Sequence, residues 1–123
     1  MVGQLDHVMM RVEDLEAAEK FYKGHFGYEE VGRWDADTFT NVHLAPPDAS
    51  DDAATLELTY NHDGRSYTMG DAWGHIAVRV DDVYEAYDEL MDAGVEDYRD
   101  PDSCGGSYAF VKDPDGHEIE IVE

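Results

Sequence analysis

Apolar side chains recur every three or four positions in two stretches of this chain, residues 14–26 and 82–93. Such spacing places the apolar groups on one face of a helix, so each stretch predicts an amphipathic helix. Gly27 follows the first stretch and Gly94 follows the second, at the place where a glycine commonly ends a helix. Each predicted helix therefore has a predicted end as well as a predicted buried face.

The remaining apolar segments are short and are typical of strands. Residues 55–60 and 117–123 alternate with a period of two, which gives a strand one polar and one apolar face. Proline and aspartate in residues 46–53 predict a loop, and the sequence Asp113-Pro114-Asp115-Gly116 predicts a turn. The predicted strands are 4–12, 28–34, 38–45 and 55–60, then 74–80, 95–99, 107–112 and 117–123.

The two halves of the chain also match each other in sequence. The segment from His7 to Leu15 aligns with the segment from His75 to Val83 at a constant offset of 68 residues. Near the end of each half, Leu56-Glu57-Leu58 aligns with Ile119-Glu120-Ile121. A repeat of this kind predicts two copies of one supersecondary unit.

The order of elements in each half is one strand, one helix and three further strands. We therefore expect an α+β fold made of two tandem βαβββ modules. The 123 residues amount to one domain, 1–123, with the first module at 4–60, a linker at 61–73 and the second module at 74–123.

Charge narrows the classes of partner. The chain has 30 acidic and 8 basic residues, which gives a formal net charge of −22. Nucleic acids and anionic membranes both bind through Lys and Arg, so neither is an expected partner. The carboxylates are spread along the whole chain, whereas lysine occurs only at positions 20, 23 and 112. Because molar salt screens such charge, this composition predicts a protein from a halophile, with an ordinary acidic protein that has a basic partner as the alternative.

The single cysteine and the absence of long apolar runs bear on the compartment. Cys104 alone excludes an intramolecular disulfide. No apolar run approaches the length of a membrane span, and no signal peptide precedes the first predicted strand. We therefore expect a cytoplasmic protein.

Each half of the chain carries one histidine on its first predicted strand and one glutamate on its last, His7 with Glu57 and His75 with Glu120. Alternation with a period of two puts both glutamates on the polar face of their strand. Imidazole and carboxylate suit Ni, Co, Fe, Mn or Zn, and four such groups leave two positions of an octahedral ion for water or substrate. The duplicated pair therefore predicts a divalent metal site.

The other histidines are weaker candidates for chemistry. A structural role is favoured for His25, at the end of the first predicted helix, and for His43, on a strand whose inward face the sequence leaves open. His62 and His117 follow motif residues and are candidates for the rim of a pocket. Cys104 has no basic neighbour in sequence that would activate a thiol.

Several segments together resemble glyoxalase I (lactoylglutathione lyase) of the vicinal oxygen chelate superfamily. They are His7-Val-Met-Met-Arg11-Val-Glu-Asp14-Leu15, Phe21-Tyr22, Phe26-Gly27, Glu57-Leu58-Thr59-Tyr60-Asn61, Gly74-His75-Ile76-Ala77, and Asp113-Pro114-Asp115-Gly116 followed by Glu118-Ile119-Glu120. The resemblance covers nearly the whole chain, and the block from Glu57 to Asn61 is the part most specific to glyoxalase I. It implies curved mixed sheets around a metal site.

The resemblance also implies a ligand set and an assembly. His7, Glu57, His75 and Glu120 would hold one divalent ion per site. A histidine at position 7 resembles the short bacterial enzymes that favour nickel or cobalt, with zinc, manganese and iron as further candidates. Glyoxalase I builds its sites between the two subunits of a homodimer.

The implied activity is that of a lyase that detoxifies methylglyoxal. Methylglyoxal adds a γ-glutamyl thiol, either glutathione or γ-glutamylcysteine, and the enzyme isomerises the hemithioacetal to the S-lactoyl thioester. Glu120 would move the proton from C1 to C2, with Glu57 as the mirror-related acid and His75 beside the substrate. Arg11 and Asn61 match the positions that bind the γ-glutamyl end of the thiol.

The chain departs from the resemblance at Cys104 and at Asp71, where longer relatives have a basic residue four positions before the second histidine. Cys104 stands where bacterial relatives have a lysine, before Gly105 and Gly106. That lysine would meet the carboxylate at the glycyl end of glutathione. Its replacement by cysteine favours γ-glutamylcysteine, which lacks the glycine, as the preferred thiol.

Two other functions fit the same scaffold. One is another metalloenzyme of the superfamily, an epimerase or a ring-cleaving dioxygenase, although many of those dioxygenases hold iron with two histidines and one glutamate. The other is a non-catalytic protein that binds a small molecule or confers drug resistance. Proteins of that class commonly lose the metal ligands, whereas this chain keeps all four.

Overall fold

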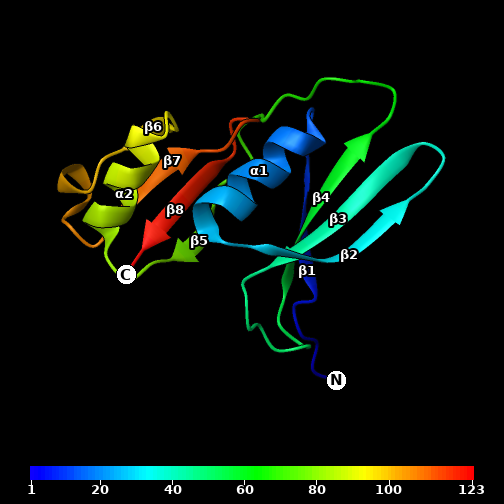
Figure 1. Ribbon diagram of the computed structural model, residues 1–123, viewed down its shortest axis with the longest axis horizontal. Coiled ribbons are helices and arrows are strands. Elements are labelled where there is room, and N and C mark those ends of the chain that lie inside the picture. The colour runs from blue at the N-terminus through cyan, green and yellow to red at the C-terminus, as the bar shows by residue number, and fades with distance from the viewer. The chain divides into compact units, whose positions relative to one another are not determined.

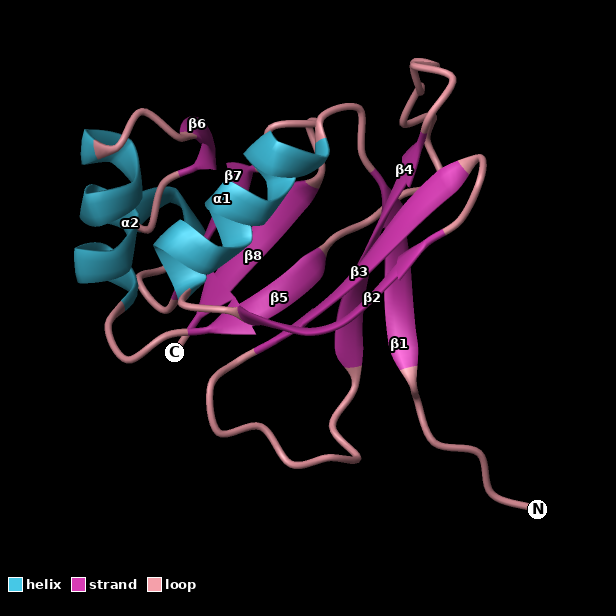
Figure 2. Ribbon diagram, turned by 45° about the vertical axis from the view of Figure 1, so that its right-hand side comes forward, coloured by secondary structure: helices cyan, strands magenta, loops and turns pink.

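Each half of the chain folds into a four-stranded sheet with one helix packed against it, as Figure 1 and Figure 2 show. The computed structural model describes residues 1–123, which divide into two units, Met1–Tyr67 and Thr68–Glu123. The prediction of two βαβββ modules in an α+β fold is confirmed. The division between the units falls inside the segment 61–73.

The first unit has a mixed sheet in which β4 is an inner strand. Its elements are β1 (His7–Arg11), α1 (Leu15–Phe26), β2 (Glu29–Asp35), β3 (Phe39–Ala45) and β4 (Thr55–Asn61). The strand order is β1-β4-β3-β2. β1 runs parallel to β4, while β3 is antiparallel to both β4 and β2. Side chains of β4 therefore lie next to those of β1 on one side and β3 on the other.

The second unit repeats this topology. Its elements are β5 (Ile76–Arg79), α2 (Val83–Asp92), β6 (Glu96–Arg99), β7 (Tyr108–Lys112) and β8 (Glu118–Val122). The strand order is β5-β8-β7-β6, with β5 parallel to β8. The segment between β6 and β7 contains a short 3-10 helix, η1 (Asp102–Cys104).

Both helices begin at an aspartate that the repeat places at the same position. Asp14 accepts a hydrogen bond from the Ala17 backbone N–H at 3.1 Å, and Asp82 accepts one from the Glu85 N–H at 3.0 Å. These caps satisfy backbone donors that have no partner within a helix. α1 ends where Gly27 adopts a φ of 70°, a conformation that glycine tolerates best.

Each unit has its own hydrophobic core between the helix and one face of the sheet. In the first unit, Tyr22 of α1 is fully buried, as are Val42, Leu44 and Leu58 of the sheet. In the second unit the largest fully buried side chains are those of Val83, Val111, Ile119 and Ile121. Because strand side chains alternate between the two faces, the glutamates between these aliphatic residues project to the face away from the core.

The parallel strands are shorter than the sequence predicts. The predicted strand 4–12 is observed as β1, which begins at His7 because its partner β4 begins at Thr55, opposite His7. The predicted strand 74–80 is observed as β5, which begins at Ile76. His75 therefore lies just before its strand. Neither helix is long and apolar enough to span a membrane.

Candidate active site

The first unit brings His7 and Glu57 together. Parallel pairing sets Met9 of β1 beside Glu57 of β4, and His7 lies two residues before Met9 on the same face of the strand. The Nε2 atom of His7 is 3.0 Å from Oε2 of Glu57. The His7 side chain is 40% exposed and the Glu57 side chain only 10%. We call these two residues the first half-site.

The second unit builds the same pair from His75 and Glu120, which we call the second half-site. The Nε2 atom of His75 is 3.1 Å from Oε2 of Glu120. Register again explains the contact, because Ala77 of β5 lies beside Glu120 of β8 and His75 lies two residues before Ala77. The His75 side chain is 42% exposed and that of Glu120 is 20% exposed. Each predicted His–Glu pair is thus brought together within its own unit.

The donor set of the first half-site fits a divalent cation. The Nδ1–H group of His7 donates a hydrogen bond to the Asp6 carboxylate at 2.6 Å, so the neutral ring turns its Nε2 lone pair toward Glu57. Metal-ligating histidines are commonly held in this way by a carboxylate on the other ring nitrogen. Two acceptor atoms only 3.0 Å apart require positive charge between them, which a proton or a metal ion can supply.

The electrostatics of His7 agree with this geometry. The hydrogen bond to Asp6 raises the pKa of His7 above its ordinary value, and the Glu57 carboxylate acts in the same direction. Two carboxylates from different elements therefore favour positive charge at this imidazole. A divalent ion at Nε2 would meet the same attraction as the proton does.

A pocket of about 260 Å³ in the first unit adjoins Glu57. It contains Arg11 and Asn61, the two residues predicted to bind the thiol. The full lining is Met9, Arg11, Phe39, Asn41, Glu57, Thr59, Asn61 and Arg65. We call it the Arg11 pocket. It combines two guanidinium groups with amide and hydroxyl groups, a combination that suits a ligand carrying a carboxylate.

Hydrogen bonds orient several side chains of the Arg11 pocket. The Asn61 amide donates to the Tyr67 hydroxyl at 2.6 Å, and the Thr59 hydroxyl donates to Oδ1 of Asn41 at 2.8 Å. Arg65 is held by the carboxylate of Asp63. Arg65 was missed in the sequence analysis, although its place four residues after Asn61 and the scarcity of cations in this chain were available signals.

His43 was also missed as a site residue, because the sequence favoured a structural role for it. Its Nε2 atom is 3.4 Å from Oε2 of Glu57, and its ring lies edge-on to that of His7 at 5.2 Å between centroids. The cause is the antiparallel register, which places His43 of β3 directly opposite Glu57 of β4. Knowing that register in advance would have identified the residue.

A third group of potential ligands lies in the turn between β7 and β8. Asp113, Asp115 and His117 bring ligand-type atoms within 4.8 Å of one another. Asp113 accepts hydrogen bonds from the backbone N–H groups of Asp115 and His117 and from the His117 ring. These hydrogen bonds within the turn explain why the three side chains lie close together without a metal ion. His117 is buried against Trp73 and does not form the rim of a pocket, which corrects that expectation.

The structure places Cys104 in the loop before β7 and His62 directly after β4. Cys104 ends η1 and is half-buried, and Gly105 and Gly106 follow it with positive φ angles. His62 lies within hydrogen-bond distance of the Thr40 hydroxyl and of the Asp37 carbonyl.

Comparison with known proteins gives one consistent result. A family model described as the Glyoxalase/Bleomycin resistance protein/Dioxygenase superfamily matches residues 4–121. The lactoylglutathione lyase of Neisseria meningitidis is 39% identical over 98% of this chain and 90% of that protein. The trypanothione-dependent glyoxalase I of Leishmania major shares 39% identity and superposes with a TM-score of 0.86, covering 99% of this chain and 87% of that one.

A longer plant protein shows the same likeness over part of its length. The glyoxalase I of Zea mays superposes with a TM-score of 0.83 at 31% identity, and the match covers 97% of this chain and 44% of the plant chain. Fold, sequence and the duplicated His–Glu pair thus agree. This chain belongs to the glyoxalase I family of the glyoxalase/bleomycin resistance/dioxygenase superfamily.

Proposed function

We propose that this protein is a metal-dependent lyase of the glyoxalase I type, which isomerises the hemithioacetal of methylglyoxal and a γ-glutamyl thiol to the S-lactoyl thioester. The observation that carries the proposal is the duplicated pair, with His–Glu distances of 3.0 Å and 3.1 Å. The Arg11 pocket beside one of these pairs offers a place for the thiol. Relatives that are 39% identical over nearly the whole chain are named for this activity.

The proposed metal ligands are His7, Glu57, His75 and Glu120, and nickel or cobalt is the proposed ion. A divalent ion held by these side chains supplies Lewis-acid stabilisation of negative charge that develops on the substrate oxygens. Each half-site offers two ligands, so one ion needs a first and a second half-site. We place this meeting between the subunits of a homodimer, the arrangement implied by the family resemblance.

Glu120 is the proposed proton carrier. Its carboxylate takes the proton from C1 of the hemithioacetal and returns it to C2, while the hydroxyl proton passes from the C1 oxygen to the C2 oxygen. The carbonyl thereby moves from C2 to C1, and no atom is gained or lost. A correctly placed general base contributes about 10²–10⁴-fold to the rate. Glu120 is the more exposed of the two glutamates, and the side chain opposite it on β7 is the apolar ring of Phe110.

Arg11, Asn61 and Arg65 are the proposed contacts of the γ-glutamyl end. That end carries both a carboxylate and an amino group, and the Arg11 pocket supplies guanidinium donors together with amide oxygen acceptors. His75 is proposed to border the reacting part of the substrate. At the other end of the thiol, Cys104 offers no cation, so γ-glutamylcysteine is the proposed preferred thiol and glutathione the poorer one.

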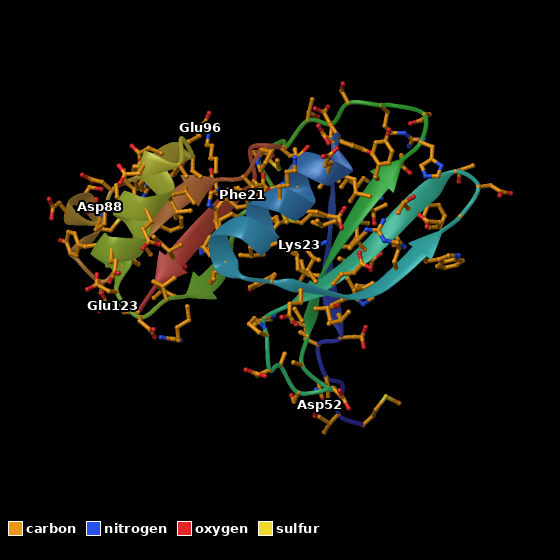
Figure 3. The ribbon with its side chains drawn as sticks, viewed as in Figure 1. Phe21, Lys23, Asp52, Asp88, Glu96 and Glu123 are labelled. Atoms are coloured by element: carbon orange, nitrogen blue, oxygen red, sulfur yellow. The ribbon has the colours of Figure 1, made fainter.

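The surface charge supports a proposed setting. Asp52, Asp88 and Glu96 lie at the periphery of their units and are exposed, as Figure 3 shows. Such carboxylates repel one another in dilute buffer and tolerate molar salt. We propose a cytoplasmic enzyme of a halophile that keeps high internal salt.

Metal analysis and one absorbance assay test the proposal. The protein is stripped of metal, loaded with Ni²⁺, Co²⁺ or Zn²⁺ in 2 M KCl, and assayed at 240 nm with methylglyoxal and either thiol. Thioester formation that depends on added metal supports a glyoxalase I. Tight metal binding without thioester formation points to another metalloenzyme of the superfamily, and failure to bind metal points to a non-catalytic binding protein.

A further inference from the structure

The two half-sites differ in the residue that packs against the proposed ligand histidine. In the first unit His43 lies opposite Glu57, and in the second unit Phe110 lies opposite Glu120. Both rings stand edge-on to the ligand histidine, His43 at 5.2 Å and 82° from His7 and Phe110 at 5.0 Å and 80° from His75. The second unit thus provides a built-in comparison, with the same packing and no nitrogen.

His43 contacts the carboxylate that the first half-site presents. Its Nε2 atom is 3.4 Å from Oε2 of Glu57, the same oxygen that His7 approaches at 3.0 Å. Its Nδ1 atom is 2.7 Å from the Thr55 hydroxyl, which fixes the plane of the ring. When the Thr55 hydroxyl donates to Nδ1, the ring proton sits on Nε2, the ring nitrogen that lies 3.4 Å from Glu57.

The rest of the Glu57 environment is also polar. Oε1 of Glu57 lies 3.4 Å from the Thr59 hydroxyl, and the side chain is 10% exposed, against 20% for Glu120. Oε2 of Glu57 lies beside two imidazole rings and Oε2 of Glu120 beside one, which leaves Glu57 less room to rotate. A carboxylate that moves a proton between two carbon atoms must reorient. The two glutamates of the repeat therefore have surroundings suited to different tasks.

We propose that His43 is a positioning residue that holds Glu57 in the orientation of a metal ligand and so leaves the proton transfer to Glu120. The proposal rests on the proposed function for its two tasks. It concerns the contact between His43 and Glu57, and it assigns no bond between His43 and the ion. The carboxylate opposite Phe110 lacks the corresponding donor and keeps its freedom.

Four single variants test the contact. His43→Phe copies the repeat and removes both nitrogens. His43→Gln places an amide N–H near the position of Nε2, and His43→Asn places an amide near Nδ1, where it reaches Thr55 but not Glu57. His25→Phe makes the same chemical change on α1, where His25 is exposed and packs on Phe21, and serves as the matched control.

The first readout is the affinity of the metal-free full-length protein for Co²⁺, titrated against a competing chelator in 2 M KCl. Loss of a partner that orients a metal ligand typically weakens metal binding by about ten- to hundredfold. We expect that loss for His43→Phe and His43→Asn, recovery to within about threefold for His43→Gln, and no change for His25→Phe. Circular dichroism verifies that each variant is folded.

Three results of this titration would overturn the proposal. If His43→Phe binds Co²⁺ as tightly as the wild type, the contact does not hold the ligand. If His43→Asn recovers affinity as fully as His43→Gln, packing on Thr55 explains the effect instead. A Co²⁺ absorption spectrum that changes shape in saturated His43→Gln would make His43 a direct ligand and would also refute a positioning role.

The second readout is the kcat of Phe110→His at saturating Co²⁺, since this variant gives Glu120 the neighbour that Glu57 has. We expect kcat to fall by about tenfold or more while KM stays within about twofold, because only proton transfer is slowed. An unchanged kcat refutes the division of tasks. Wild-type protein that binds Co²⁺ but forms no thioester refutes the proposed function, while the ranking of Co²⁺ affinities still tests the role of His43.

Discussion

Replacing Glu120 by glutamine separates proton transfer from metal binding. Glutamine has nearly the shape of glutamate and keeps an oxygen that can face His75, whose Nε2 atom lies 3.1 Å from the native carboxylate. It loses the ability to accept the C1 proton. A general base contributes about 10²–10⁴-fold, which corresponds to about 2.7–5.5 kcal/mol of transition-state stabilisation. We therefore expect kcat to fall at least about 100-fold.

Glu57→Gln is the counterpart variant in the repeat. Glu57 is proposed to act as a ligand, so its loss should weaken Co²⁺ binding while kcat at saturating Co²⁺ falls by less than about tenfold. Both variants are assayed at 240 nm after the Co²⁺ content has been measured. Glu89→Gln on the exposed face of α2 removes the same charge and should retain full activity. A Glu120→Gln enzyme that keeps more than about a tenth of kcat, or equal losses in both variants, would refute the assignment.

Three further outcomes are expected. The melting temperature and the activity should rise from 0.1 to 2 M KCl, because the Debye length falls from about 10 Å at 0.1 M to about 3 Å at 1 M and screens a net charge of −22; a flat or falling melting curve contradicts this. Cys104→Lys should shift kcat/KM toward glutathione by about ten- to hundredfold relative to γ-glutamylcysteine, since a charge-assisted hydrogen bond contributes ~1.5–3 kcal/mol; a wild type that already prefers glutathione tenfold contradicts the reason given. Asp113→Ala removes the acceptor of two backbone N–H groups and one ring N–H in a buried turn, so we expect a loss of about 3 kcal/mol or more and a melting temperature lower by roughly 10 °C, with an unchanged melting temperature as the contrary result.

The fold could be predicted from the sequence because local and repeated signals agree. Asp14 and Asp82 begin helices at the repeat offset, and Gly27 and Gly94 follow the ends of those helices. Strand ends were less predictable. β1 does not include residues 4–6, because β4 begins at Thr55, opposite His7, and offers these residues no strand partner. The extent of a partner strand is not a local property of the sequence.

The His–Glu pairs could be predicted because each pair recurs in the repeat, whereas His43 could not. Its position opposite Glu57 depends on the register between β3 and β4 across the loop 46–53. The sequence of either strand alone does not determine that register. The repeat gave no indication of a role for His43 either, because the matching residue of the second unit, Phe110, is apolar. Arg65 follows the last strand of the first module, in a segment read as a linker.

The strand pairing of the first unit has a consequence for the order in which the chain folds. β3 and β4 are joined by a short loop and can pair early, because closing a small loop costs little entropy. β1 and β4 are neighbours in the sheet but are separated in sequence by α1, β2 and β3, so a much longer loop must close before they pair. We expect this pairing to be the slowest of the unit to form. The contact between His43 and Glu57 should therefore form earlier in folding than the contact between His7 and Glu57. We therefore expect a folding stage in which Glu57 already has the His43 imidazole beside it, and the docking of β1 then adds the His7 imidazole as the second.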